Sequence, residues 1–262
     1  KKITLLTNIG QKNDEKKFIQ SNLEKNIKTI FLNKKNSPTI TKKRFIEHIN
    51  KAKVLGVYTL NDQPLDKDQE NKLNNKIQKL IKSHDLVIVS DYGHGFISDR
   101  TAKLIVNKSK FVAVNTQLNA SNLGFHVISK YVGANFITIN ETEMRHELRN
   151  KTEDRMLLIK TLSKKLKSKY THVTSGSMGS SIFNSTSKEI TSCPAFANRI
   201  MDKVGTGDTM LAILAISLFK KFDIRFTMFL SALAAAQNIQ DMANKTPINK
   251  VNITRALQSY LK

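Results

Sequence analysis

Short apolar segments alternate with helical segments along most of this 262-residue chain, and this alternation limits the fold more than any other feature. Short segments bounded by turns, such as 85–90 and 170–174, are predicted strands. Segments with apolar residues three and four positions apart, such as 69–82 and 100–109, are predicted helices. The pattern predicts an α/β fold with a doubly wound, mostly parallel sheet and helices on both faces.

Several shorter segments complete this prediction. The segments 30–32, 44–49 and 53–58 are predicted to form a small antiparallel layer outside the parallel core. Ten glycines and four prolines are too few for a long flexible linker, so one domain over residues 1–262 is expected. The other expected strands are 3–9, 111–114, 134–139, 180–183 and 189–191, and the other expected helices are 16–25, 142–149, 151–166, 207–219, 225–242 and 253–261.

The charge balance is strongly basic, with 43 Lys and Arg against 21 Asp and Glu, a net charge of +22. The lysines are spread over the whole sequence, and neither arginine–aromatic interleaving nor zinc-finger spacing accompanies them. This distribution predicts a solvated basic surface and no specific nucleic-acid partner. The longest apolar stretch, 210–219, is too short for a bilayer, so no membrane partner is predicted. A single cysteine, Cys193, excludes an intrachain disulfide and favours a reducing cytoplasm.

Four of the ten glycines lie in two short segments, 174–179 and 202–208. The second segment opens an apolar helix, and glycines there let successive backbone N–H groups converge on an anion such as a phosphoryl group. Asp208 stands at the same helix start, where its carboxylate could take a proton from a hydroxyl nucleophile. An ordinary glycine turn with Asp208 as the helix N-cap is the alternative on spacing alone.

The segment Asp202-Lys203-Val204-Gly205-Thr206-Gly207-Asp208 closely resembles the C-terminal signature of the ribokinase-like (pfkB) carbohydrate kinases. The resemblance implies that Gly205, Thr206 and Gly207 form an anion hole and that Asp208 is the catalytic base. It also implies a ribokinase-like fold, ATP as phosphoryl donor, and a monovalent cation such as K⁺ near Asp202.

Two further motifs of this family follow in the expected order. The segment Asn140-Glu141-Thr142-Glu143 resembles the Asn-x-x-Glu element, which implies that Asn140 and Glu143 organise Mg²⁺ and the nucleotide phosphates. Glu143 would order magnesium-bound waters, because Mg²⁺ keeps much of its hydration. The segment 173–179 resembles the strand and glycine turn that contacts ATP, which implies contacts from Thr174, Gly176 and Gly179. Asn238 would flank the adenine by its position in the family.

Three more segments, 37–44, 90–95 and 131–134, resemble the kinase domain of the bifunctional heptose-phosphate kinase/adenylyltransferases. The resemblance implies a heptose 7-phosphate-like substrate that feeds surface-polysaccharide (lipopolysaccharide) precursor synthesis. It implies substrate contacts from Lys42, Arg44 and Asp91 and a β lid over about residues 27–60. A nucleotidyltransferase domain fused in the parent protein and a homodimer are both compatible with it.

Some positions depart from the family pattern. Asn115-Thr116-Gln117 stands where Asp-Pro-Lys is usual, and His94 replaces a lysine. The chain begins near the family's Val-Gly-x-Asp region, represented by Ile9, Gly10 and Asp14, so the sugar-binding first strand and Gly-Gly motif are expected to be missing. Two alternatives therefore remain: a kinase of the same fold for another sugar or a nucleoside, and a non-catalytic binding module.

Overall fold

A computed structural model describes residues 2–13, 15–49, 52–119, 122–125, 128–197, 201–202, 204–240, 242 and 246–260, so Asp14 lies outside the described residues. The chain divides into two compact units, Lys1–Lys76 with His94–Ser98 and Ile77–Gly93 with Asp99–Lys262. The interpretation of residues 1–262 as one domain stays a prediction. Within the described ranges, no helix has both the length and the apolar character needed to cross a bilayer.

The first unit contains two small two-stranded sheets. Strands β1 and β2 pair in parallel, because the intervening helix α1 makes the crossover that parallel strands require. The prediction that 30–32 joins an antiparallel layer was therefore wrong, whereas β3 and β4 do pair antiparallel. The elements are β1 (Ile3–Gly10), α1 (Lys16–Ser21), β2 (Ile27–Lys34), β3 (Thr41–Ile46), β4 (Lys53–Thr59) and the first part of α2 (Lys67–Ile81).

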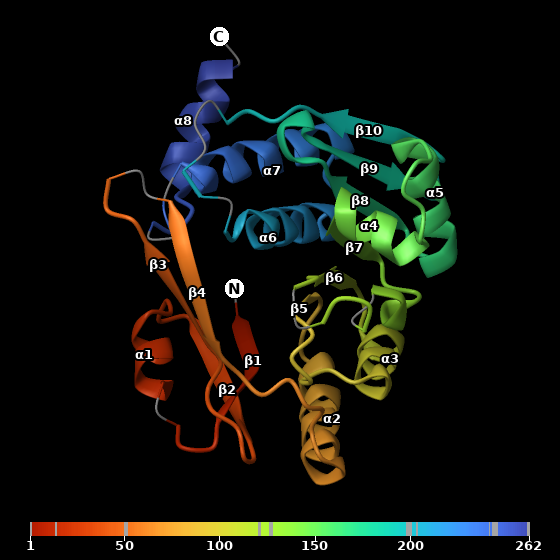
Figure 1. The fold of residues 1–262 in the computed structure, drawn as a ribbon. Coiled ribbons are helices and arrows are strands. Elements are labelled where there is room, and N and C mark those ends of the chain that lie inside the picture. The colour runs from red at the N-terminus through yellow and green to blue at the C-terminus, as the bar shows by residue number, and fades with distance from the viewer. Residues whose placement is uncertain are drawn as a thin grey trace. The chain divides into compact units, whose positions relative to one another are not determined.

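The second unit is built on a six-stranded sheet with the order β10-β9-β8-β7-β6-β5 (Figure 1). Strands β5 to β8 are parallel, and β9 and β10 extend the sheet as the predicted antiparallel hairpin. The carboxyl ends of the four parallel strands meet at one edge, where open α/β sheets bind ligands. The strands are β5 (Val87–Asp91), β6 (Val112–Thr116), β7 (Phe136–Asn140), β8 (Tyr170–Thr174), β9 (Ser180–Asn184) and β10 (Ile190–Cys193).

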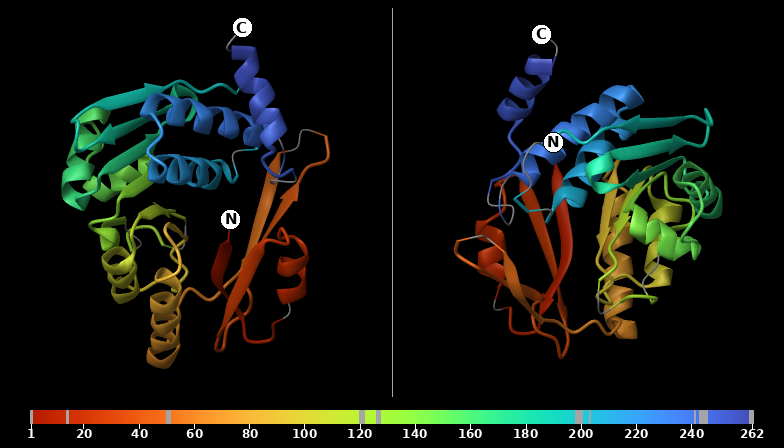
Figure 2. Two further views of the ribbon diagram at one scale, coloured as in Figure 1. Left: turned by 180° about the vertical axis from the view of Figure 1, so that it is seen from behind. Right: turned by 45° about the horizontal axis from the view of Figure 1, so that its top comes forward.

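Helices cover both faces of this sheet. Ala113 and Phe136 are paired in register and pack into one buried cluster with apolar residues of α6 and α7, which lie side by side (Figure 2). Their neighbours Val114 and Ile137 point to the opposite face because strand side chains alternate, and both are fully buried. The helices of this unit are α3 (Asp99–Lys108), α4 (Glu141–Leu148), α5 (Arg155–Leu166), α6 (Thr206–Phe219), α7 (Ile224–Ile239) and α8 (Lys250–Tyr260).

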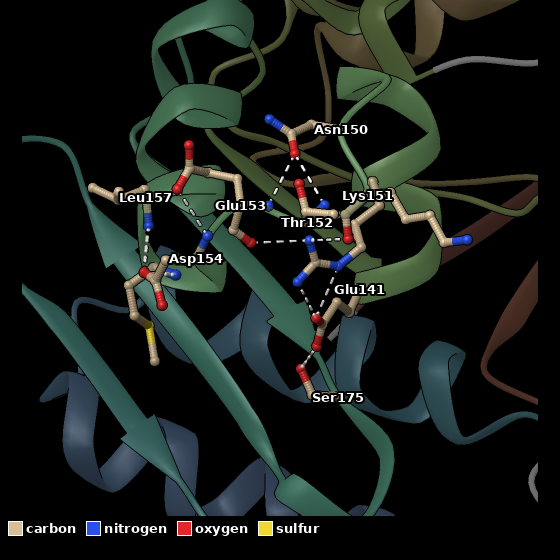
Figure 3. Close-up of polar contacts among 10 residues, drawn as sticks. Glu141, Asn150, Lys151, Thr152, Glu153, Asp154, Leu157 and Ser175 are labelled. Carbon is tan, nitrogen blue, oxygen red and sulfur yellow. Dashed lines mark hydrogen bonds and ion pairs between the residues drawn. The ribbon is translucent and has the colours of Figure 1, made fainter.

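Helix α5 begins four residues later than the predicted start at Lys151. The Asp154 side chain accepts hydrogen bonds from the backbone N–H groups of Met156 and Leu157 and so caps the helix (Figure 3). Residues 151–153 instead form a bend, in which the carbonyl oxygens of Lys151 and Glu153 accept hydrogen bonds from Arg145. The start of this helix is therefore set by the aspartate cap. The apolar spacing, which placed the start at Lys151, does not locate it.

Candidate active site

The glycine turn before α6 forms an open, electropositive helix start. Gly205 is the N-cap residue in a left-handed conformation with φ of 79°, and no side chain caps the helix there. A Cβ atom placed on Gly207 would meet nothing within 4 Å. The first N–H groups of α6 are thus accessible beside an unobstructed backbone, which suits a phosphoryl group. Asp208 lies in the first helical turn, so the alternative that it is the N-cap was wrong.

The Asp208 carboxylate accepts hydrogen bonds from two hydroxyl groups at the end of β5. Ser90 Oγ donates to Oδ1 at 2.9 Å, and the Tyr92 phenol donates to Oδ2 at 2.7 Å. Burial and the negative charge of Asp208 raise the pKa of Tyr92 far above its ordinary value, so the phenol is a donor. Sequence reasoning singled out this segment but did not connect these hydroxyls with Asp208.

Asp91 lies between these two residues and is turned the other way, as side-chain alternation requires. Its carboxylate is 5% exposed and forms a 2.6 Å ion pair with Lys130. It also accepts hydrogen bonds from the Tyr131 phenol at 2.6 Å and from the Gly93 backbone N–H at 3.0 Å. Burial, followed by the Asp91 charge, holds the pKa of Tyr131 well above its usual range. These contacts give Asp91 a structural role at the end of β5, and its predicted role in substrate binding stays a prediction.

Asn140 and Glu143 form a capping box at the start of α4. The Asn140 side chain accepts from the Glu143 N–H at 2.8 Å, and Glu143 Oε2 accepts from the Asn140 N–H at 2.9 Å. Glu143 Oε1 accepts from the Leu118 N–H at 3.1 Å. Burial raises the pKa of Glu143, and these backbone hydrogen bonds act against the rise. The carboxylate is therefore held by backbone groups, which fits contact with a hydrated Mg²⁺ through water.

A cavity of about 450 Å³ in this unit brings together predicted residues from three separate segments of the chain. Small and apolar residues of 194–197 and of α7, including Phe196, Ala235 and Ala236, also line it. Such a surface suits the flat face of a purine, while the glycine turns suit phosphates. The predicted residues that line it are Asn140, Glu143, Thr174, Gly176, Gly179, Thr206 and Gly207.

The glycine turn after β8 is tightly packed on one side. The Ser175 N–H donates to the Gly179 carbonyl at 2.8 Å, which closes the turn. Gly179 has φ of 81°, and a Cβ there would lie 2.1 Å from the Cys193 carbonyl oxygen. Gly176 also has a positive φ, of 58°, but a Cβ there would meet nothing within 4 Å. This turn therefore needs glycine at both positions, for close approach at one and for backbone conformation at both.

A polar network ties this turn to α4, as Figure 3 shows. Ser175 Oγ donates to Glu141 Oε2 at 2.8 Å, and Arg145 donates to Glu141 Oε1 from Nε at 3.1 Å and Nη2 at 2.7 Å. Arg145 Nη1 also donates to the carbonyls of Lys151 and Glu153. Although partial burial alone would raise the pKa of Glu141, the bonds from Arg145 and Ser175 lower it overall. Sequence reasoning missed this network, and the i,i+4 spacing of Glu141 and Arg145 was the available signal.

The remaining predicted residues have separate places. Asn238 is buried on α7, where its Oδ1 accepts from the Thr206 hydroxyl at 3.0 Å, so it reaches the cavity through Thr206. Asp202 is 5% exposed, and its Oδ1 accepts from the Val204 N–H at 3.1 Å. Lys42 and Arg44 lie on β3 of the first unit, where burial and then the Arg44 charge lower the pKa of Lys42. In the described part of the chain, no group of three or more His, Cys, Asp or Glu side chains could hold a metal ion.

Comparison with known proteins gives matches over most of the chain. The profile of the pfkB family carbohydrate kinases matches residues 1–250. The Bifunctional protein HldE of Campylobacter curvus is 30% identical over 181 residues, which cover 68% of this chain and 37% of that protein. The protein of the same name from Campylobacter jejuni is 29% identical over 233 residues, covering 87% and 48% of the two chains. The chain thus spans less than half the length of these curated relatives.

Solved structures share the fold at low sequence identity. Phosphofructokinase-2 from Escherichia coli, in complex with potassium, superposes with a TM-score of 0.79 at 11% identity. The match covers 99% of this chain and 82% of the phosphofructokinase-2 chain. Ribokinase from Giardia lamblia gives a TM-score of 0.72 at 16% identity, with 97% and 82% coverage. These likenesses establish the ribokinase-like α/β fold. With the family profile covering nearly its whole length, the chain belongs to the pfkB family of carbohydrate kinases.

Proposed function

We propose that this protein transfers the γ-phosphoryl group of magnesium ATP to a hydroxyl of a sugar or sugar phosphate, with Asp208 as the general base. The observation that carries the proposal is the position of Asp208, which lies in the first turn of α6 directly after the open glycine backbone of Gly207. A base beside an anion-binding helix start is what in-line phosphoryl transfer from ATP requires.

The chain's own residues have distinct tasks in this reaction. Gly205, Thr206 and Gly207 present the N-terminal N–H groups of α6 to the phosphates and stabilise negative charge on the group in transfer. Asp208 accepts the hydroxyl proton as the sugar oxygen bonds to phosphorus, and the bond between phosphorus and the oxygen of ADP breaks. Thr174, Gly176 and Gly179 hold the nucleotide in the cavity, with Phe196 and the small residues of α7 against its base.

Asn140 and Glu143 are the residues that would hold Mg²⁺ beside the phosphates. When bound, Mg²⁺ neutralises charge on the phosphate oxygens. Glu143 is buried, with both carboxylate oxygens bonded to backbone N–H groups, so it would contact the ion through water. A monovalent cation such as K⁺ near Asp202 belongs to the same proposal, and the phosphofructokinase-2 neighbour solved in complex with potassium has the same fold.

A heptose 7-phosphate-like acceptor is the favoured substrate. Support comes from the resemblance of 37–44, 90–95 and 131–134 to heptose-phosphate kinase domains and from the relatives called Bifunctional protein HldE. The word bifunctional in that name supports a second domain in the parent protein, for which the resemblance implies a nucleotidyltransferase. ATP as donor agrees with a cytoplasmic location. A kinase for another sugar or a nucleoside is the second candidate, because Asn115 and His94 stand where the family has other residues.

Coupled ADP release with magnesium ATP tests the proposal. Heptose 7-phosphate, fructose phosphates, ribose and nucleosides serve as acceptors, with Asp208→Asn as the inactive comparison. We expect sugar-dependent turnover that falls about 10²- to 10⁴-fold in the variant, the range that general base catalysis contributes. ATP binding without turnover on any acceptor would support a non-catalytic binding module instead.

A further inference from the structure

The two hydroxyl groups on Asp208 differ in how firmly the protein holds them. Ser90, on Oδ1, is an exposed residue near the end of β5. Tyr92, on Oδ2, is partly buried and follows the strand. Because Ser90 is exposed and Tyr92 is partly buried, the two carboxylate oxygens are not equivalent toward an incoming substrate.

Tyr92 is held by hydrogen bonds to its backbone carbonyl and by the contacts of its two chain neighbours. Its backbone carbonyl accepts hydrogen bonds from the side-chain amides of Asn119 and Asn122, both at 3.1 Å. Its neighbours Asp91 and Gly93 are held by the buried ion pair with Lys130 and by the 3.0 Å hydrogen bond between them. The phenol oxygen is therefore anchored through the backbone, and with it the orientation of the Asp208 carboxylate.

The Tyr92 phenol also cannot act as the base in place of Asp208 during turnover. Burial and then the charge of Asp208 raise the pKa of its phenol, so the group keeps its proton and continues to donate to Oδ2. The Ser90 hydroxyl, in contrast, lies where water or a substrate hydroxyl can replace it at little cost, since an exposed hydroxyl regains its hydrogen bonds from solvent.

We propose that Oδ1 of Asp208 is the oxygen that takes the substrate proton, that the substrate hydroxyl replaces Ser90 there, and that Tyr92 is the positioning residue that holds the carboxylate through Oδ2. The inference rests on the proposed function. In the step itself, the substrate O–H bond breaks as its proton passes to Oδ1, the oxygen bonds to the γ-phosphorus, and the bond from phosphorus to ADP breaks. The Tyr92 proton does not move.

The test compares Tyr92→Phe and Ser90→Ala with wild type in the same ADP-release assay, with Tyr170→Phe as the matched control. Tyr170 lies on β8 and packs against the apolar cluster that includes residues of α6, and neither hydrogen bond to Asp208 described above comes from it. We expect kcat of Tyr92→Phe to fall about 10- to 100-fold, the effect of losing one hydrogen bond to a charged group. The KM for ATP and the thermal midpoint should stay at wild-type values, and Tyr170→Phe should match wild type.

Ser90→Ala should have the opposite signature. Without the hydroxyl that competes for Oδ1, the KM for the sugar is expected to fall about two- to fivefold, a modest gain because the displaced group is solvated. A fall in kcat as large as that of Tyr92→Phe would overturn the assignment of Oδ1, since Ser90 would then be needed during the reaction.

The outcomes separate the inference from the function on which it rests. Turnover that requires Asp208 but stays within about threefold of wild type in Tyr92→Phe would overturn the inference alone, because a positioning hydrogen bond to a charge is worth more than that. Absence of sugar-dependent turnover in wild type, or its survival in Asp208→Asn, would overturn the proposed function and the inference with it.

Discussion

The sheet of β3 and β4 and the six-stranded sheet were both predicted from extended apolar segments, yet their environments are opposite. Every residue of β4 is exposed, including Leu55 at 56% and Tyr58 at 54%. In the six-stranded sheet, β7 is buried at every residue before Asn140. The first sheet has two strands and no buried face, whereas the second is covered by helices on both faces. Apolar residues in a strand therefore do not by themselves show what the strand packs against.

This difference separates two functions of the molecule. The glycine turns, Asn140 and Asp208 are attached to elements whose positions are fixed by a packed core, as precise phosphoryl transfer requires. Lys42 and Arg44 are attached to a sheet with little buried surface, which is typical of regions that open at low free energy. We expect changes around the six-stranded sheet to affect folding and chemistry together. Changes in the sheet of β3 and β4 should affect only binding.

The largest expected effect is a loss of stability in the covered sheet. Ile137→Ala removes a fully buried side chain of β7 and should lower the free energy of unfolding by about 2–5 kcal/mol. Val57→Ala on β4, where the residue is 45% exposed, should change it by about 0.5 kcal/mol or less. Urea denaturation of both variants measures the difference. Equal losses would mean that β4 is packed as firmly as β7.

The two glycine turns give the next largest contrast. Gly179→Ala places a Cβ against the Cys193 carbonyl in a strained conformation and should lower the free energy of unfolding by about 1–3 kcal/mol. Gly207→Ala has open space and lies within α6, so it should leave stability unchanged or raise it by up to about 1 kcal/mol.

The ATP affinity of Gly207→Ala is the second measurement on these two glycine turns. The new methyl group of Gly207→Ala projects beside the anion-binding turn and should weaken ATP binding in a fully folded protein. Calorimetric titration and denaturation of the same sample separate the two effects. Unchanged ATP affinity in Gly207→Ala would show that the phosphates do not approach this backbone.

Much of this arrangement could be predicted because it depends on local patterns. Strand β8 was predicted with its observed limits, and the turn before α6 was assigned to phosphate because scarce glycines precede an apolar helix. The parallel pairing of β1 with β2 was not predicted, since short extended segments carry no signal of their partner. Ser90 and Tyr92 stand more than 110 residues before Asp208, and no spacing rule connects them.

A smaller effect is expected on the exposed sheet. Lys42 and Arg44 share one face of β3, so removing both as Lys42→Ala with Arg44→Ala should raise the KM for a phosphorylated sugar about tenfold or more, the value of one charge-assisted hydrogen bond. Lys43→Ala is the matched control, because it removes a charge from the opposite face of the same strand. Steady-state kinetics at constant ionic strength measures both. An equal rise in KM for Lys43→Ala would mean that the effect comes from the net charge of the strand and not from contacts of Lys42 and Arg44 with the substrate.

The smallest expected effect is a change in the pKa of Tyr92 when the charge of Asp208 is removed. The Asp208 charge contributes to the raised pKa of Tyr92, after burial, so replacing it in Asp208→Asn should lower the pKa of Tyr92 while burial keeps it above the ordinary value. The sign follows because a nearby negative charge disfavours the phenolate. NMR of ¹³Cζ-labelled tyrosine, with Tyr92→Phe to assign the resonance, follows ionisation directly and needs no turnover. A Tyr92 resonance that titrates identically in both proteins would mean that the phenol and the carboxylate are not in contact in solution.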